Sequence, residues 1–190
     1  MKIGILSVQG AFIEQEQRLT ELGADCIQLR KAEDLEESID GLVLPGGEST
    51  VQGKLLSELS MLEPLKKKIL EGLPVFATCA GLILLARTID GREKSYFGTL
   101  PVTVKRNAYG RQLGSFFVEE ECKGIGRIPM TFIRAPYIAN TDENVEVLAR
   151  VEERIVAVKY KNQLAMAFHP ELNPDLGLHS MFTKMIEENL

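Results

Sequence analysis

The first half of the chain alternates between short apolar runs and amphipathic segments, and this alternation limits the fold more than any other feature of the sequence. Short β-rich runs bounded by turn residues indicate strands, and apolar residues at helical spacing indicate helices. The predicted strands cover residues 2–8, 26–29, 41–44 and 73–77, and the predicted helices cover residues 11–22, a segment from 49 onward, 61–70 and 81–88. Strands that alternate with helices favour parallel pairing, so we expect an α/β sheet with helices on both faces.

The pattern changes after Gly91. The predicted strands there cover residues 98–104, 115–119, 131–134, 145–151, 155–160 and 164–168, and only residues 178–190 return to a helical pattern. We therefore expect additional antiparallel strands beside a central, mostly parallel sheet flanked by helices. A length of 190 residues fits one domain, which we expect to span residues 1–190.

The composition excludes several classes of partner. Lys plus Arg number 22 and Asp plus Glu 27, and the resulting formal charge of −5 repels phosphate backbones, which argues against nucleic acid. The N-terminal run lacks the features of a signal peptide, and no apolar stretch approaches the roughly 18 residues of a membrane span. We expect a cytoplasmic protein that does not bind membranes.

The three cysteines, Cys26, Cys79 and Cys122, lie far apart, which fits neither a disulfide framework nor a CxxC site. Cys79 stands where a predicted strand meets a predicted helix, and the small residues Ala77 and Gly81 permit the sharp turn of a nucleophile elbow. The usual elbow has glycine at the position of Ala77, and a lone cysteine among apolar residues is more often part of the core. The context favours a nucleophile at Cys79, whereas Cys26 and Cys122 are interpreted as core or edge residues.

A nucleophilic thiol needs a base, and the sequence offers two histidines. His169 follows the predicted strand 164–168, at the place where the active-site loops of an α/β sheet begin. In extended backbone the side chain of Glu171 points to the same side, so its carboxylate can hold one ring nitrogen while the other faces the thiol. The alternative for His169 is a loop histidine hydrogen-bonded to backbone. His179 lies inside the predicted last helix and is given no role.

A Pro-Gly-Gly turn follows the predicted strand 41–44 and opens a helix. The two glycines, Gly46 and Gly47, allow backbone N–H groups to approach a ligand closely, which suits an oxyanion hole. The alternatives are an ordinary turn, with Ser49 acting only as a helix N-cap. Neither a Walker loop nor a GxGxxG pattern is present, so nothing supports nucleotide binding.

Three motifs together resemble the class I (triad) glutamine amidotransferases, a family with a flavodoxin-like fold. They are Gly46-Gly47-Glu48-Ser49-Thr50, Thr78-Cys79-Ala80-Gly81 and His169-Pro170-Glu171. Three segments are similar to those of the glutaminase subunits of pyridoxal 5′-phosphate synthases: LPGGEST at residues 44–50, VQGA at 8–11 and FIRAP at 132–136. The resemblance spans nearly the whole chain. It implies that Cys79, His169 and Glu171 form a triad that hydrolyses L-glutamine to L-glutamate and ammonia through a thioester.

The resemblance also implies the rest of the site. Gly47 and Ala80 would supply the oxyanion-hole N–H groups. The residues that would bind glutamine are Gly46, Gly47, Glu48, Ser49, Arg106, Ile133 and Arg134. For the two arginines the alternative is a solvated position at a strand end. No metal or organic cofactor is expected.

A partner is implied in the same way. Gln9 and Gly10 would face a barrel-type pyridoxal 5′-phosphate synthase subunit, which would receive ammonia through a protein channel and combine it with a pentose phosphate and a triose phosphate. Their alternative is an ordinary strand-to-helix turn. Two other functions stay open: a stand-alone hydrolase of γ-glutamyl or other amide bonds, and a non-catalytic module of the same fold that keeps Cys79 as a thiol sensor.

Overall fold

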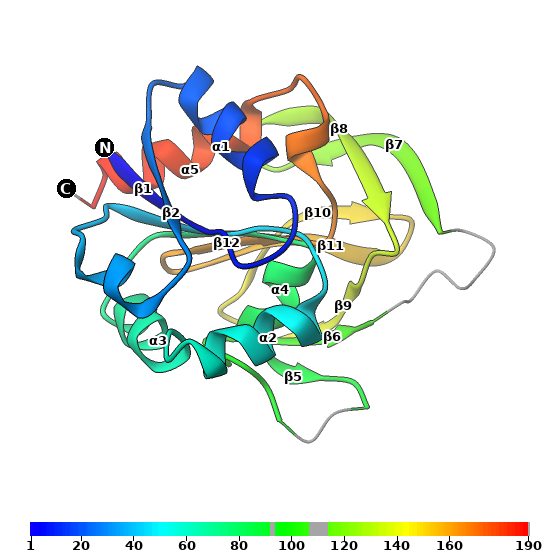
Figure 1. Ribbon diagram of the computed structural model, residues 1–190. Coiled ribbons are helices and arrows are strands. Elements are labelled where there is room, and N and C mark those ends of the chain that lie inside the picture. Colours follow the sequence, from blue (N-terminus) through cyan, green and yellow to red (C-terminus); the bar gives the residue numbers. More distant parts are fainter. Residues whose placement is uncertain (92–93, 107–113, 190) are drawn as a thin grey trace.

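The computed structural model describes residues 1–91, 94–106 and 114–189 (Figure 1). Its helices are α1 (Phe12–Glu21), α2 (Ser49–Glu58), α3 (Leu62–Leu70), α4 (Ala80–Leu85) and α5 (Gly177–Glu187), with 3₁₀ turns η1 (Ala32–Glu36) and η2 (Pro170–Leu172). Its strands are β1 (Lys2–Leu6), β2 (Asp25–Leu29), β3 (Gly41–Leu44), β4 (Val75–Thr78), β5 (Ala86–Ile89), β6 (Leu100–Lys105), β7 (Ser115–Cys122), β8 (Gly126–Ile133), β9 (Tyr137–Thr141), β10 (Glu146–Val151), β11 (Arg154–Tyr160) and β12 (Gln163–Met166).

The strands form one sheet with a parallel part and an antiparallel part. The parallel part runs in the order β2-β1-β3-β4-β12. Strands β11, β10, β7 and β8 continue the sheet in antiparallel pairs, while β9 pairs with both β11 and β6, and β6 pairs with β5. The prediction of a central, mostly parallel α/β sheet with additional antiparallel strands is confirmed.

Helices cover both faces of the parallel strands: Figure 1 shows α1 and α5 on one face and α2, α3 and α4 on the other. Strands β3 and β4 are buried along their whole length, which is why their sequences are continuously apolar rather than alternating. On one face the ring of Phe76 packs against Phe182 of α5, with centroids 5.4 Å apart. On the other, Gly81 of α4 lies so close to Leu44 that a Cβ would overlap its carbonyl.

Several boundaries differ from the sequence-based expectation. The helix predicted for residues 81–88 ends at Leu85, because the backbone of Ala86 is extended (ψ 133°) and β5 pairs with β6. The sequence there is compatible with a helix or a strand, and pairing with β6, the next strand along the chain, decides between them. Strand β9 has no predicted counterpart, and β8 begins at Gly126, before the predicted residue 131. The last helix ends at Glu187, and Leu190 of the predicted range 178–190 lies outside the described residues.

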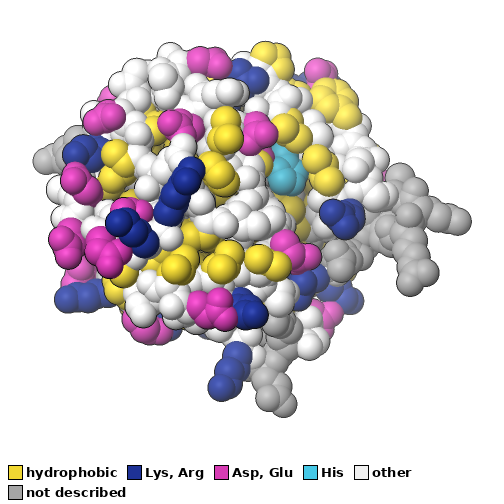
Figure 2. Space-filling model, viewed as in Figure 1, with side chains coloured by type: hydrophobic (Ala, Val, Ile, Leu, Met, Phe, Trp, Pro, Cys, Tyr) yellow, Lys and Arg dark blue, Asp and Glu magenta, His cyan; other side chains and the backbone are white. Residues whose placement is uncertain are grey.

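The surface carries charges of both signs. Figure 2 shows acidic and basic side chains interspersed with hydrophobic ones over one face of the molecule. Among the residues that the structure describes, no helix has both the length and the apolar character that a membrane crossing requires.

Candidate active site

The segments that carry the predicted triad follow neighbouring parallel strands. β3, β4 and β12 lie side by side, with Ala77 of β4 opposite Leu44 on one side and Ala165 on the other. The glycine turn follows β3, Cys79 follows β4, and His169 follows β12. Because parallel strands end at the same edge of a sheet, the fold brings these three segments together at the carboxyl edge.

Cys79 occupies a strained turn between β4 and α4. Its backbone has φ 47° and ψ −98°, a conformation that costs a residue with a side chain about 1–3 kcal/mol. The Cys79 N–H donates to the carbonyl of Met166 at 2.8 Å, which ties the turn to β12. The close approach of Gly81 to the Leu44 carbonyl explains why a small residue follows the nucleophile. The residue Cys79 is 7% exposed.

His169 lies between the thiol and a carboxylate. Its Nδ1 is 2.7 Å from Oε1 of Glu171, and both residues are buried. The expectation that Glu171 lies in extended backbone is wrong. Glu171 lies in the 3₁₀ turn η2, which directs its carboxylate back toward the ring. Burial lowers the pKa of His169, but its contacts with Cys79 and Glu171 raise it, on balance to about 10. An imidazole placed in this way can exchange a proton with a nucleophile.

Gly46 packs against the same imidazole. A Cβ at this position would lie 2.9 Å from Nδ1 of His169 and 3.5 Å from Cβ of Cys79, so only glycine leaves room for the ring. The Gly46 N–H donates to Oγ1 of Thr78 at 2.9 Å, and its carbonyl accepts from the N–H of Ala11 at 2.9 Å. These two bonds fix the orientation of the glycine turn beside the thiol.

Gln9 and Gly10, which we expect at a partner-facing surface, contact the glycine turn from the other side. Oε1 of Gln9 accepts from the N–H of Glu48 at 2.8 Å, and Nε2 of Gln52 donates to the carbonyl of Gln9 at 2.9 Å. Gly10 has φ 104°, and a Cβ there would overlap the carbonyl of Gly46. Since Gly10 is exposed and Gln9 is half-buried, this segment links the protein surface to the glycine turn.

A cavity of about 340 Å³ opens over the thiol and the imidazole. Its lining consists of Gln9, Gly47, Glu48, Ser49, Cys79, Ile83, Arg106, Ile133, Arg134 and His169. The volume falls in the range of roughly 300–1,000 Å³ that is usual for small-molecule sites. Ile83 is a wall residue that the sequence did not indicate. Of the residues expected to bind glutamine, Gly46 packs behind the His169 ring rather than lining the cavity, and Ala80, the second expected oxyanion donor, is buried as the first residue of α4.

The cavity wall carries both signs of charge. Nη2 of Arg106 lies 3.7 Å from Oε1 of Glu48 and 3.3 Å from Oγ1 of Thr50. The N-cap of α2 is Glu48 and not Ser49, which is the first helical residue, so the capping alternative for Ser49 is wrong. A guanidinium and a carboxylate in one wall match a ligand that carries a carboxylate and an ammonium group.

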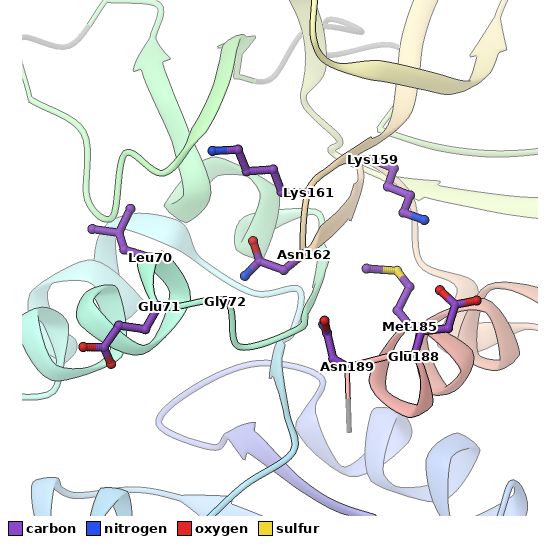
Figure 3. A pocket seen from close by; sticks show the side chains of 9 residues that line it. All are labelled: Leu70, Glu71, Gly72, Lys159, Lys161, Asn162, Met185, Glu188 and Asn189. Atoms are coloured by element: carbon purple, nitrogen blue, oxygen red, sulfur yellow. The ribbon is translucent and has the colours of Figure 1, made fainter.

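A second pocket lies at the opposite edge of the parallel strands (Figure 3). It is lined by Leu70, Glu71, Gly72, Lys159, Lys161, Asn162, Met185, Glu188 and Asn189. Both amide hydrogens of Asn162 are used to hold backbone, because Nδ2 donates to the carbonyls of Ile69 and Leu73. The residues that line this pocket include neither a thiol nor an imidazole, unlike those of the cavity over Cys79.

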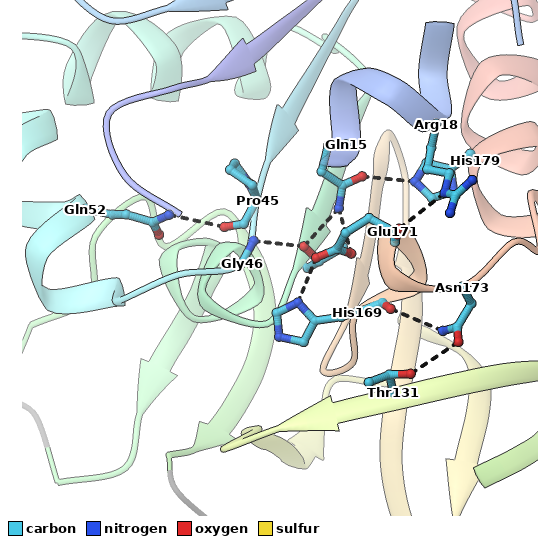
Figure 4. A network of polar contacts seen from close by, with 11 residues as sticks. Gln15, Arg18, Pro45, Gly46, Gln52, Thr131, His169, Glu171, Asn173 and His179 are labelled. Atoms are coloured by element: carbon cyan, nitrogen blue, oxygen red, sulfur yellow. Dashed lines mark hydrogen bonds and ion pairs between the residues drawn. The ribbon is translucent and has the colours of Figure 1, made fainter. Parts of the chain in front are cut away.

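A buried polar network behind the imidazole is missing from the sequence-based description (Figure 4). It joins Glu171 to Gln15 of α1, to Thr78 and to His179 of α5. A sequence signal does exist, since Gln15 lies on the apolar stripe of its helix with Leu19, where a polar residue is unusual. His179, given no role from sequence, is fully buried in this network.

The other two cysteines lie away from the cavity. Burial raises the pKa of both Cys26 and Cys122 to about 11, which disfavours their thiolates. Among residues 1–91, 94–106 and 114–189, no group of three or more His, Cys, Asp and Glu side chains is placed to hold a metal ion.

The fold makes this chain a class I glutamine amidotransferase, and its thiol, imidazole and carboxylate lie together beneath a cavity that carries both signs of charge. A solved structure described as a glutamine amidotransferase has a TM-score of 0.93 and 42% identity, and covers 97% of this chain and 98% of that one. Another glutamine amidotransferase structure, from Thermotoga maritima, is only 15% identical and shares the fold with a TM-score of 0.65, covering 100% of this chain and 84% of that one.

Within this class the chain belongs to the SNO glutamine amidotransferase family, whose family model matches residues 5–188. Similar curated relatives carry the name pyridoxal 5′-phosphate synthase subunit PdxT. The relative from Desulfitobacterium hafniense (strain Y51) is 58% identical over 188 residues, which are 99% of this chain and 94% of the relative. That from Streptococcus pneumoniae (strain CGSP14) is 54% identical over an alignment of 191 residues that covers 99% of this chain and 98% of the relative.

Proposed function

We propose that this chain is the glutaminase subunit of a pyridoxal 5′-phosphate synthase, which hydrolyses L-glutamine to L-glutamate and ammonia and delivers the ammonia to a synthase subunit. The observation that carries the proposal is the position of His169, whose ring lies between Glu171 and a thiol on a strained strand-to-helix turn. The names of the relatives, at 54% and 58% identity, support the choice of synthase.

In the proposed mechanism His169 takes the proton of Cys79, and the thiolate attacks the side-chain amide carbon of glutamine. The same imidazole, now protonated, gives its proton to the leaving nitrogen, so ammonia departs and a γ-glutamyl thioester remains. His169 then takes a proton from water, whose oxygen attacks the thioester carbon. Glutamate leaves as the C–S bond breaks, and the proton returns to the sulfur.

Glutamine is proposed to bind in the cavity over the thiol. Arg106 and Arg134 would bind its α-carboxylate and Glu48 its α-ammonium, because the wall provides both charges within the reach of one small zwitterion. Gly47, Ser49 and Ile133 line the same cavity and would complete the fit.

The oxyanion that forms during the attack is proposed to be held by the backbone N–H groups of Gly47 and Ala80. Gly47 lines the cavity, and Ala80 is the first residue of α4, where a helix has N–H groups without partners inside the helix. The carbonyl of Gly46 accepts from Ala11, so the orientation of the peptide before Gly47 depends on the Gln9–Gly10 segment next to it.

The partner is proposed to be a barrel-type synthase subunit that docks over the Gln9–Gly10 segment and receives ammonia through a channel. Gly10 is exposed there and contacts the glycine turn. A protein bound at Gly10 would therefore be separated from the proposed oxyanion site by this one residue and would act on the site through it. A cytoplasmic location is part of this proposal, because a reducing compartment favours free thiols such as those of Cys26, Cys79 and Cys122.

The test compares two nitrogen sources in the reconstituted complex with the synthase subunit. Cys79→Ala should abolish pyridoxal 5′-phosphate formation from glutamine and leave formation from ammonium salts intact, because only ammonia production requires the thiol. Glutamine-dependent synthesis that survives the substitution would refute the proposed role of Cys79.

A further inference from the structure

A second histidine is connected to the triad through one buried glutamine (Figure 4). Nε2 of His179 lies 2.9 Å from Oε1 of Gln15, and Nε2 of Gln15 lies 2.9 Å from Oε2 of Glu171. Gln15 and His179 are both fully buried, and they come from α1 and α5, on the helical layer behind the triad. The carboxylate of Glu171 therefore accepts from His169 at one oxygen and from Gln15 at the other.

The chemistry of the donors fixes the direction of each bond. An ionised carboxylate only accepts, so Gln15 must present its NH₂ group to Glu171 and its oxygen to His179. His179 must then carry its proton on Nε2 and donate it to Gln15. Burial, together with the nearby charge of Arg18, lowers the pKa of His179 to about 4, which keeps the ring neutral in this tautomer.

The same amide also reaches the turn before the nucleophile. Nε2 of Gln15 lies 3.3 Å from Oγ1 of Thr78, the oxygen that accepts the N–H of Gly46. One side chain therefore contacts both the carboxylate of the triad and the residue that anchors the glycine turn.

The packing of His179 indicates why a polar ring stands at this buried position. Its ring lies 5.0 Å from that of Phe76, and its Nδ1 is buried without a hydrogen-bond partner among the described residues. A phenylalanine would have no unpaired ring atom, but it would leave the buried Oε1 of Gln15 without its donor, and an unpaired buried polar atom is destabilising. The feature that histidine adds is the Nε2 donor, which holds the amide of Gln15 in the orientation that Glu171 needs.

We propose that Gln15 and His179 are positioning residues of the glutaminase site: His179 orients Gln15, Gln15 orients Glu171, and Glu171 directs His169 toward Cys79. This inference rests on the proposed function and adds two residues that do not line the substrate cavity.

The experiment measures kcat and KM for glutamine in the complex with the synthase subunit. Gln15→Met and His179→Phe should each lower kcat about tenfold or more, since a hydrogen bond to a charged group is lost or misdirected, and leave KM nearly unchanged. His179→Gln keeps a donor of similar reach and should retain most of kcat. Phe182→Leu, which also packs on Phe76, is the matched control: it should lower thermal stability without lowering kcat.

The double variant Gln15→Met/His179→Phe tests whether His179 acts on the triad through Gln15 or independently of it. If His179 acts through Gln15, the double variant is as slow as Gln15→Met alone, because there is no amide left to orient. Wild-type kcat in His179→Phe, or effects that multiply in the double variant, would overturn the inference.

A second readout does not depend on glutamine hydrolysis. The rate of Cys79 alkylation by iodoacetamide, followed on its own peptide, should fall in Gln15→Met and His179→Phe, because His169 is held less well against the thiol. Unchanged alkylation in both variants would overturn the positioning role. A wild-type complex that is alkylated normally at Cys79 but hydrolyses no glutamine would instead refute the proposed function alone.

Discussion

The imidazole of His169 packs directly on the backbone of Gly46, with no space for a side chain between them. A Cβ at Gly46 would lie 2.9 Å from Nδ1 and still closer to Cε1 of the ring. Since the Gly46 N–H is held by Thr78, the glycine turn cannot simply move away from an added methyl group. The glycine turn therefore acts as a wall that sets the position of the base.

Gly46→Ala should displace the His169 ring and lower kcat for glutamine about a hundredfold, because small misplacements of reacting groups cost this much. Gly114→Ala is the matched control, since a Cβ there would meet no atom of the described residues within 4 Å. Circular dichroism would establish that both variants fold. Full activity in Gly46→Ala would contradict the packing argument.

Glu171→Gln should lower kcat by about two to four orders of magnitude, less than loss of Cys79, and leave KM close to its original value. Both oxygens of Glu171 accept hydrogen bonds, from His169 and from Gln15, whereas an amide offers one oxygen and one NH₂ group. One contact must be lost, and His169 is then oriented less well. Steady-state kinetics measures the separation, and an increase in KM alone would contradict it.

Arg106→Gln should raise KM for glutamine about tenfold or more and change kcat little, because the lost contact binds substrate and transition state alike. The neighbouring Lys105→Gln is the control, since Lys105 pairs with Asp90 and does not line the cavity. If both variants raise KM equally, a general effect of charge explains the result better than contact with the substrate.

Addition of the synthase subunit should increase glutamine hydrolysis by this chain, because the Gln9–Gly10 segment links the proposed docking surface to the peptide before Gly47. The measurement compares glutamate release by the isolated chain and by the mixture. Equal rates would favour a stand-alone amide hydrolase. No hydrolysis in either sample, with Cys79 still readily alkylated, would favour a thiol-sensing module.

His179 should make the fold sensitive to acid. Its pKa is about 4 in the folded chain and 6.5 in the reference state, so between these values the unfolded chain binds a proton that the folded chain does not. The free energy of unfolding is therefore independent of this histidine's titration above pH 6.5. It falls as the pH falls from 6.5 toward 4, by about 3 kcal/mol in total. Urea unfolding across this range should show a shallower pH dependence for His179→Phe than for the wild type. Parallel curves for the two proteins would contradict the assignment.

The sequence by itself determined the order of strands and α-helices from β1 to α4 and the position of each motif at the end of a strand. These features depend on local information: the apolar runs of β3 and β4, the turn residues after them, and the small residues around Cys79. Local patterns failed where the same residues are compatible with a helix and with a strand. Residues 86–88 were predicted as the end of a helix, but they belong to the strand Ala86–Ile89, which pairs with β6.

Only the tertiary structure decided which strands are neighbours and which polar groups meet. β12 lies beside β4 although all the antiparallel strands come between them in the chain, and this pairing brings His169 to Cys79. Gln15 and His179 each appear in sequence as polar residues on an apolar helix face, but their contact joins helices from opposite ends of the chain. The physical reason is that periodicity acts over a few residues, whereas pairing and burial are set by the whole core, where a buried polar group is stable only with a partner.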